Sequence, residues 1–159
     1  MEHLLLNNDL LLPCPEGFRV MEDAERDSLQ MIEKGPGIVL SDPARHMMIS
    51  VGWKQPNGLA LLLLSDGDLV KKTEQTVRKA MQPCGYRAEG PTRHLNRVAG
   101  LTMNGFRYGY TAQGVEMSAE TCILRRKKTL YYFHCYVRAA QREEGFALWE
   151  SVLGSIDGR

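Results

Sequence analysis

Alternating apolar positions predict a β-hairpin in the second half of the chain. The segment Leu101 to Ala112 carries Phe106, Tyr108 and Tyr110 on every second position, which is the side-chain period of a β-strand. Gln113-Gly114 follows and is typical of a tight turn, because glycine can take a positive φ there. We therefore expect two antiparallel strands joined by this turn.

The two turn residues set the register of the hairpin. The residues predicted to face each other are Ala112 with Val115, Tyr110 with Met117, Tyr108 with Ala119, Phe106 with Thr121 and, on the opposite face, Arg107 with Glu120. One face is then apolar, and the other carries a pair of opposite charges. Both features stabilise a hairpin, so the residue pattern agrees with the register.

A second hairpin is predicted to turn at the basic run from Arg125 to Lys128. The returning strand, Thr129 to Arg138, carries Leu130, Tyr132, His134 and Tyr136 on one face, and Tyr131, Phe133, Cys135 and Val137 on the other. Neither face is polar, so the strand lies in the middle of a sheet that is covered on both faces, or that has a pocket on one of them. The meander from Leu101 to Arg138, preceded by a strand at Arg93 to Ala99, is therefore predicted to form the centre of the sheet.

The spacing of apolar residues predicts two helices outside this meander. One begins at the capping residues Ser65-Asp66 and ends at Pro83-Cys84-Gly85, where proline and glycine stop it. The other spans Arg142 to Ile156, and its apolar stripe, which includes Trp149, should dock across the sheet. The apolar run Leu59 to Leu64 fits either a buried strand or the first turns of a helix.

Short apolar runs between turn-forming residues predict further strands. Ile38 to Leu40 and Met47 to Trp53 flank a turn-rich insert and are typical of a hairpin. Asp9 to Pro15 and Gly17 to Met21 suit an edge strand or a strand with a corner, because proline removes a hydrogen bond of the ladder. The charged segment Glu22 to Glu33 fits a short helix or an irregular surface segment.

The order of these elements and several local stretches resemble a known family. The stretches are PEGFRV (Pro15 to Val20), V-A-G-L…F-R-Y-G-Y (Val98 to Tyr110), the aromatic strand L-Y-Y-F-H-C-Y-V and the final helix F-A-L-W-E-S-V-L-G-S-I. Together they look like the PsbP-like superfamily. That superfamily includes the photosystem II protein PsbP, the Ran-binding protein Mog, the DcrB-like bacterial proteins and the Eag-type chaperones of secreted effectors.

The resemblance implies an α+β fold in which an antiparallel sheet is flanked by helices on both faces, as an α/β/α sandwich. It covers nearly the whole chain. It also implies a protein that binds other proteins rather than one that catalyses a reaction. Because the superfamily has no shared catalytic motif, the resemblance assigns no functional residue to this sequence.

Composition supports a globular domain. The 159 residues match one domain of roughly 100–200 residues, so we expect residues 1–159 to form a single domain. A formal net charge of +1 removes any global attraction to polyanions. The N-terminal apolar run lacks a preceding basic region, and the longest apolar stretch is far short of the ~20 residues of a membrane span. We therefore expect a cytoplasmic protein without a membrane span, with its thiols free and reduced.

No arrangement of residues predicts a catalytic site, a metal site or a cofactor. The four cysteines are far apart and have no zinc-type spacing. A cysteine–histidine dyad would require Cys122 to meet His134 on one face of the sheet, since neighbouring His134 and Cys135 point to opposite faces. We expect instead a packed histidine beside buried, inert thiols, and no enzyme activity.

The basic turn is the strongest charge cluster of the sequence. We expect Arg125, Arg126, Lys127 and Lys128 to be exposed and to repel one another, so that they contact an acidic partner or simply keep the hairpin soluble. No recognition motif accompanies this charge, which argues against specific nucleic-acid binding.

Two functions remain. The first is a non-catalytic protein-interaction or chaperone-like adaptor whose partner is another protein. The alternative is a small-molecule-binding protein or an unrecognised enzyme that uses an aromatic cleft beside Tyr132, His134 and Tyr136. An enclosed polar and aromatic pocket would favour the alternative, whereas a flat or grooved apolar patch would favour the adaptor.

Overall fold

A large antiparallel sheet organises the protein. The computed structural model describes residues 2–29, 35–96 and 102–158. The strand order is β3-β4-β5-β10-β9-β8-β6, and β7 pairs separately with β8. The strands are β3 (Arg19–Val20), β4 (Gly37–Asp42), β5 (Met47–Lys54), β6 (Arg87–Ala88), β7 (Arg93–Asn96), β8 (Thr102–Ala112), β9 (Val115–Arg126) and β10 (Thr129–Arg138). The predicted meander does form the centre of this sheet, because β10 also pairs with β5.

The predicted register of the first hairpin is confirmed. β8 and β9 pair from Ala112 with Val115 down to Phe106 with Thr121, and Arg107 faces Glu120. The second turn is shorter than the predicted Arg125 to Lys128, because Arg125 and Arg126 pair with β10 as part of β9. The two strands join through Lys127 and Lys128, with Lys127 at a φ of 55°. Because Arg126 pairs with Thr129, His134 faces Thr121 and Cys122 faces Phe133.

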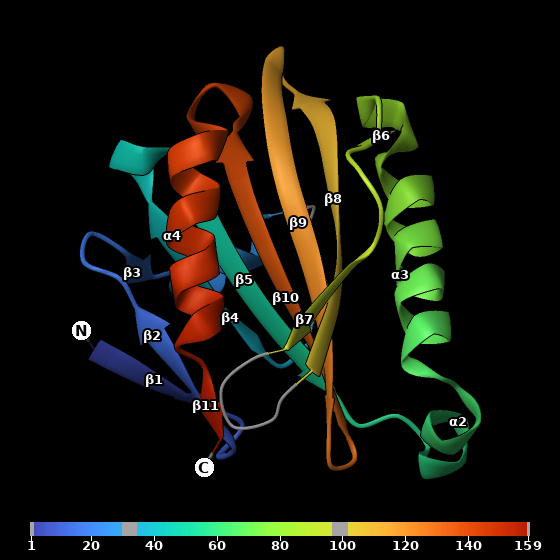
Figure 1. Ribbon diagram of the computed structural model, residues 1–159. Coiled ribbons are helices and arrows are strands. Elements are labelled where there is room, and N and C mark those ends of the chain that lie inside the picture. The colour runs from blue at the N-terminus through green and yellow to red at the C-terminus, as the bar shows by residue number, and fades with distance from the viewer. Residues whose placement is uncertain (1, 30–34, 97–101, 159) are drawn as a thin grey trace.

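Helices cover both faces of the sheet, which is the predicted α/β/α arrangement (Figure 1). α3 (Asp66–Met81) lies on one face and α4 (Arg142–Gly154) on the other. The predicted cap of α3 is present, since Oγ of Ser65 accepts a hydrogen bond from the backbone N–H of Asp68 at 3.0 Å.

The ambiguous run at Leu59 to Leu64 is helical. α2 (Gly58–Leu63) begins after Asn57, whose side-chain oxygen accepts a hydrogen bond from the backbone N–H of Leu59 at 3.1 Å. Two of its leucines lie outside the core, which a buried strand would not allow. Leu59 is 63% exposed and Leu63 is 74% exposed.

The N-terminal segment differs from the prediction. β2 (Leu10–Cys14) is not an edge strand, because it lies between β1 (Glu2–Leu6) and β11 (Asp157–Gly158) in a second, three-stranded sheet. Asn7 and Asn8, at φ values of 53° and 54°, make the turn from β1 to β2. β3 is an edge strand, as expected.

The remaining N-terminal and central expectations are confirmed in part. α1 (Asp23–Asp27) accounts for the first half of the charged segment Glu22 to Glu33, whose residues 30–34 lie outside the described residues. The strand predicted at Arg93 to Ala99 is present as β7, and residues 97–99 also lie outside the described ones.

The two faces of the sheet bury different cores. On the α4 face, Trp149 packs with Tyr131, Phe133 and Ile49 in a large cluster that also receives β1 and β2. On the α3 face, the cluster is smaller and consists of Val70, Phe106, Tyr108, Tyr110, Ala119, Ile123 and Tyr136. The larger core therefore holds α4, and the smaller one holds α3.

Truncation of Trp149 should strongly destabilise the protein. The side chain is fully buried. We expect Trp149→Ala to lower the free energy of unfolding by about 3–5 kcal/mol in denaturant melts, the usual cost of a deleted core aromatic. Ser151→Ala, at an exposed position of the same helix, is the control and should have little effect. Similar stability of the two variants would show that α4 does not depend on this contact.

Candidate functional site

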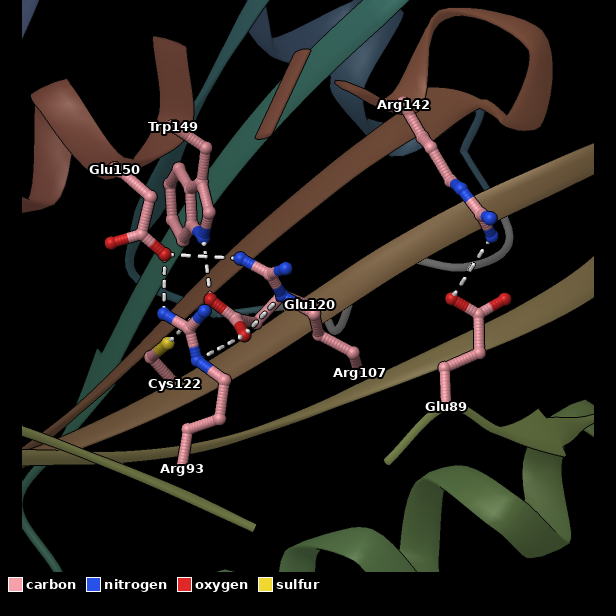
Figure 2. Close-up of polar contacts among 8 residues, drawn as sticks. All are labelled: Glu89, Arg93, Arg107, Glu120, Cys122, Arg142, Trp149 and Glu150. Carbon is pink, nitrogen blue, oxygen red and sulfur yellow. Dashed lines mark hydrogen bonds and ion pairs between the residues drawn. The ribbon is translucent and has the colours of Figure 1, made fainter. Parts of the chain in front are cut away.

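A polar cluster lies under α4 and centres on the buried Glu120 of β9 (Figure 2). Its carboxylate is 0% exposed, and Oε2 lies 2.9 Å from Nε of Arg107 and 3.1 Å from Nε of Arg93. The indole Nε1 of Trp149 donates to Oε1 at 2.9 Å. Glu150 pairs with both arginines, so two carboxylates and two guanidinium groups form one network across β7, β8, β9 and α4.

The cysteine in this network is not an activated nucleophile. The Cys122 thiol donates to Oε1 of Glu120 at 3.6 Å, and burial together with the charge of Glu120 raises the pKa of that thiol well above its usual value. A thiol held protonated is a poor nucleophile. The charges of the cluster balance one another, so the arrangement serves to fix α4 on the sheet.

Neutralising Glu120 should destabilise the fold. We expect Glu120→Gln to lower the free energy of unfolding by about 3 kcal/mol, because two arginines then lose their buried counter-charge. Glu116→Gln is a matched control, since Glu116 pairs with Arg87 on the surface and both side chains are exposed. We expect a much smaller loss for the control in the same urea melts. An equal loss in both variants would contradict a special role for the buried carboxylate.

The cysteine–histidine dyad does not form. Cys122 packs into the core of the α4 face, whereas His134 lies on the α3 face. Nδ1 of His134 is hydrogen-bonded to Oγ1 of Thr121 at 2.8 Å. Within residues 2–29, 35–96 and 102–158, no three His, Cys, Asp or Glu side chains gather as a metal site would require. In the same part of the chain, no helix has the length and apolar character to cross a bilayer.

The side chains of the basic run Arg125 to Lys128 make more contacts within the protein than expected. Nη2 of Arg125 donates to the carbonyl oxygen of Leu64 at 2.6 Å, and the same nitrogen pairs with Oδ1 of Asp66 at 3.0 Å. Arg126 and Lys127 both contact Oδ1 of Asp9, at 3.0 and 3.1 Å.

The predicted exposure is therefore wrong for Arg125 and Arg126. Their side chains pack against the protein because they form ion pairs with acidic residues that are distant in the sequence. Lys128 is the member of the turn that makes no ion pair with a described residue. The part of these four residues in binding stays a prediction.

Tyr132, His134 and Tyr136 come together in a cleft between α3 and the sheet. The cleft has a volume of about 420 Å³. Its floor is formed by β10 and β5, with Ser50 and Gly52 contributing from β5. Its far wall is formed by the inner side of α3, and α2 borders it at one end through Ala60.

The part of the floor formed by Tyr132, His134 and Tyr136 is uncharged at neutral pH. The rings of His134 and Tyr136 stack with centroids 6.0 Å apart and planes inclined by 16°. Burial lowers the pKa of His134 from 6.5 to about 4, so its imidazole is neutral at pH 7. Ser50 faces His134 in the strand register, but no hydrogen bond joins them in the described structure. The floor therefore offers aromatic surface rather than an activated nucleophile.

The helical wall is also mainly apolar. Leu69 and Val77 project from α3 into the cleft. The Oγ1 groups of Thr73 and Thr76 donate to the backbone oxygens of Leu69 and Lys72, at 2.8 and 3.0 Å. These hydroxyl groups are thus already used within the helix, and the wall presents few free polar groups to a ligand.

Sequence reasoning predicted the floor but missed the wall. The apolar positions of α3 indicated a helix that packs on the sheet, yet Thr73, Thr76, Val77 and Ala80 were not expected to face open space. The mixture of small, hydroxyl and apolar residues along one side of this helix is the signal that could have found them, because a tightly packed core favours larger side chains.

Comparison with solved structures identifies the fold, whereas no protein-family model and no curated protein matches the chain. Cyanobacterial PsbP from Synechocystis superposes with a TM-score of 0.73 at 15% identity, over 99% of this chain and 92% of that one. The chain has the PsbP-like fold.

Two further structures with this fold are similar to the chain. PA94 from Pseudomonas aeruginosa, described as a putative regulator of unknown function, has a TM-score of 0.57 at 14% identity. The superposition covers 100% of this chain and 97% of PA94. LpqN from Mycobacterium tuberculosis, described as involved in cell envelope biogenesis, has a TM-score of 0.56 at 11% identity. The superposition covers 94% of this chain and 82% of LpqN.

The lowered pKa of His134 makes the stability of the protein depend on pH. Burial lowers the pKa of His134 to about 4, so the unfolded chain binds a proton below about pH 6.5 that the folded protein does not. Stability is therefore complete above that pH and falls as the pH is lowered toward 4. We expect a loss of about 2 kcal/mol between about pH 7.5 and pH 5. Urea melts of the wild type and of His134→Gln measure it, and an equal loss in both would contradict this cause.

Proposed function

We propose that the protein is a non-catalytic, chaperone-like adaptor that holds an apolar segment of another protein in the cleft between α3 and the sheet. The observation that carries this proposal is the continuity of the cleft with α2. Ala60 of this helix borders the cleft, and Leu59 and Leu63 of the same helix are largely exposed. Exposed leucines beside an apolar cleft are typical of a surface that a partner covers.

The size and openness of this surface favour a protein partner. A small ligand needs a cleft of about this volume. It does not need the two exposed leucines of α2, which extend the apolar surface beyond the cleft. An extended apolar segment would contact both parts and would cover Leu59 and Leu63 as well as the aromatic floor.

Arg125 supports this surface indirectly. Its guanidinium holds the carbonyl oxygen of Leu64 at the junction of α2 and α3, and Leu64 lines the cleft. We therefore assign the basic turn a positioning role at this end of the cleft, and Lys128 remains available to contact an acidic partner. As part of the same proposal, the protein acts in the cytoplasm, where its free thiols stay reduced.

The comparisons agree with a role in binding. PA94 is described as a putative regulator, and the description of LpqN names a cellular process rather than a catalysed reaction. Both likenesses concern the fold, so the argument for function remains with the cleft.

A blocked cleft tests the proposal. Thr76→Trp should fill the cleft from α3, whereas Gln75→Trp adds the same side chain at an exposed position outside the cleft lining. We expect affinity capture from the native cell to recover partners with the wild type and with Gln75→Trp, and to lose them with Thr76→Trp. Thermal melts establish that both variants fold. Recovery of the same partners by all three proteins would contradict the proposal.

A small ligand is the second candidate, because a cleft of about 420 Å³ lies in the range of small-molecule sites. Native mass spectrometry of the purified protein separates the two. A bound small molecule that is present in Gln75→Trp and absent from Thr76→Trp would favour the second candidate. A protein free of such a molecule agrees with the adaptor.

A further inference from the structure

The charged residues that line the described part of the cleft are all basic. Arg26 of α1, Lys54 at the end of β5 and Lys72 of α3 come from three separate elements. None of the three forms an ion pair with a described residue. Lys54 instead lies over the ring of Tyr132, with Nζ 5.2 Å from the ring centroid, and Arg26 donates to the backbone oxygen of Gly35 at 2.5 Å.

The acidic residues of α3 do not balance these charges. Asp66 pairs with Arg125, and Glu74 pairs with Arg78 and accepts a hydrogen bond from Tyr86. Asp68 lies four positions before Lys72, a spacing at which ion pairs form on helices, yet no ion pair joins the two. The cleft thus combines aromatic surface with positive charge that no described acidic residue pairs with.

We infer that the segment bound in the cleft carries carboxylate groups next to its apolar side chains, and that Lys54, Lys72 and Arg26 bind these carboxylates. This inference rests on the proposed function and names the chemistry of its partner. Apolar side chains would cover the rings of Tyr132 and Tyr136, while the carboxylates would meet the cations at the border.

Physical considerations favour this occupant over a neutral or a basic segment. Like charges brought together at a binding surface repel, so a basic segment would be excluded. A neutral segment would cover the lysines without replacing their hydration. A carboxylate beside Lys54 would gain an ion pair while the ammonium group keeps its contact with the Tyr132 ring.

Selection from a random peptide library tests the inference directly, because the library contains acidic, neutral and basic segments alike. The wild-type protein serves as bait, and peptides that also bind Thr76→Trp are removed. We expect the remaining peptides to combine leucine, isoleucine or phenylalanine with an excess of aspartate and glutamate. Cleft-dependent peptides without such an excess would overturn the inference and leave the proposed function intact. The absence of any cleft-dependent peptide would overturn both.

Affinity measurements with one selected peptide identify the residues. We expect Lys54→Gln and Lys72→Gln each to weaken binding about three- to tenfold at low salt, and the difference to shrink at high salt. Lys71→Gln is the matched control, because Lys71 is an exposed lysine of α3 outside the cleft lining. Equal affinities of all three variants and the wild type would overturn the inference. All four proteins should have the same melting temperature.

Discussion

The arrangement of the protein depends on the ion pairs and the hydrogen bond that the buried carboxylate of Glu120 makes. It lies in the middle of β9, is fully enclosed, and is satisfied by Arg93, Arg107 and the indole of Trp149. Such a charge is tolerated only where its partners are held in place, so β7, β8 and α4 must adopt one arrangement around it. The rest of the larger core packs around this point, because Trp149 belongs to both the polar network and the apolar cluster.

The two faces of the sheet therefore differ in how completely they are packed. The α4 face is closed by the Glu120 network, by a large apolar core and by the small sheet of β1, β2 and β11. The α3 face has a smaller core, which leaves the cleft open beside Tyr132, His134 and Tyr136. A well-packed core on one face of a sheet stabilises the fold even where the other face is incompletely packed. A partner can cover such an incompletely packed apolar surface. The proposed function follows from this division.

Much of the sheet could be predicted because its determinants are local. Gln113-Gly114 fixed one register, and the apolar character of both faces of β10 predicted a central strand in a sheet that is covered on both faces or has a pocket on one of them. The features that were missed depend on contacts between distant residues. Asp9 pairs with Arg126 across a separation of 117 residues, and no local pattern indicates that pair. The cleft depends on the distance between α3 and the sheet, and the periodicity of apolar residues does not predict this distance. The three residues of β10 in its floor, Tyr132, His134 and Tyr136, were nevertheless named together.

The central claim is that the cleft between α3 and the sheet receives a segment of another protein. Photo-crosslinking in the native cell tests it most directly, with a benzophenone amino acid incorporated at the position of Thr76, which lines the cleft, or of Gln75, which does not. The account predicts a discrete crosslinked protein adduct from the position of Thr76 and none from that of Gln75. No adduct from the position of Thr76, or the same adduct from both positions, would contradict it.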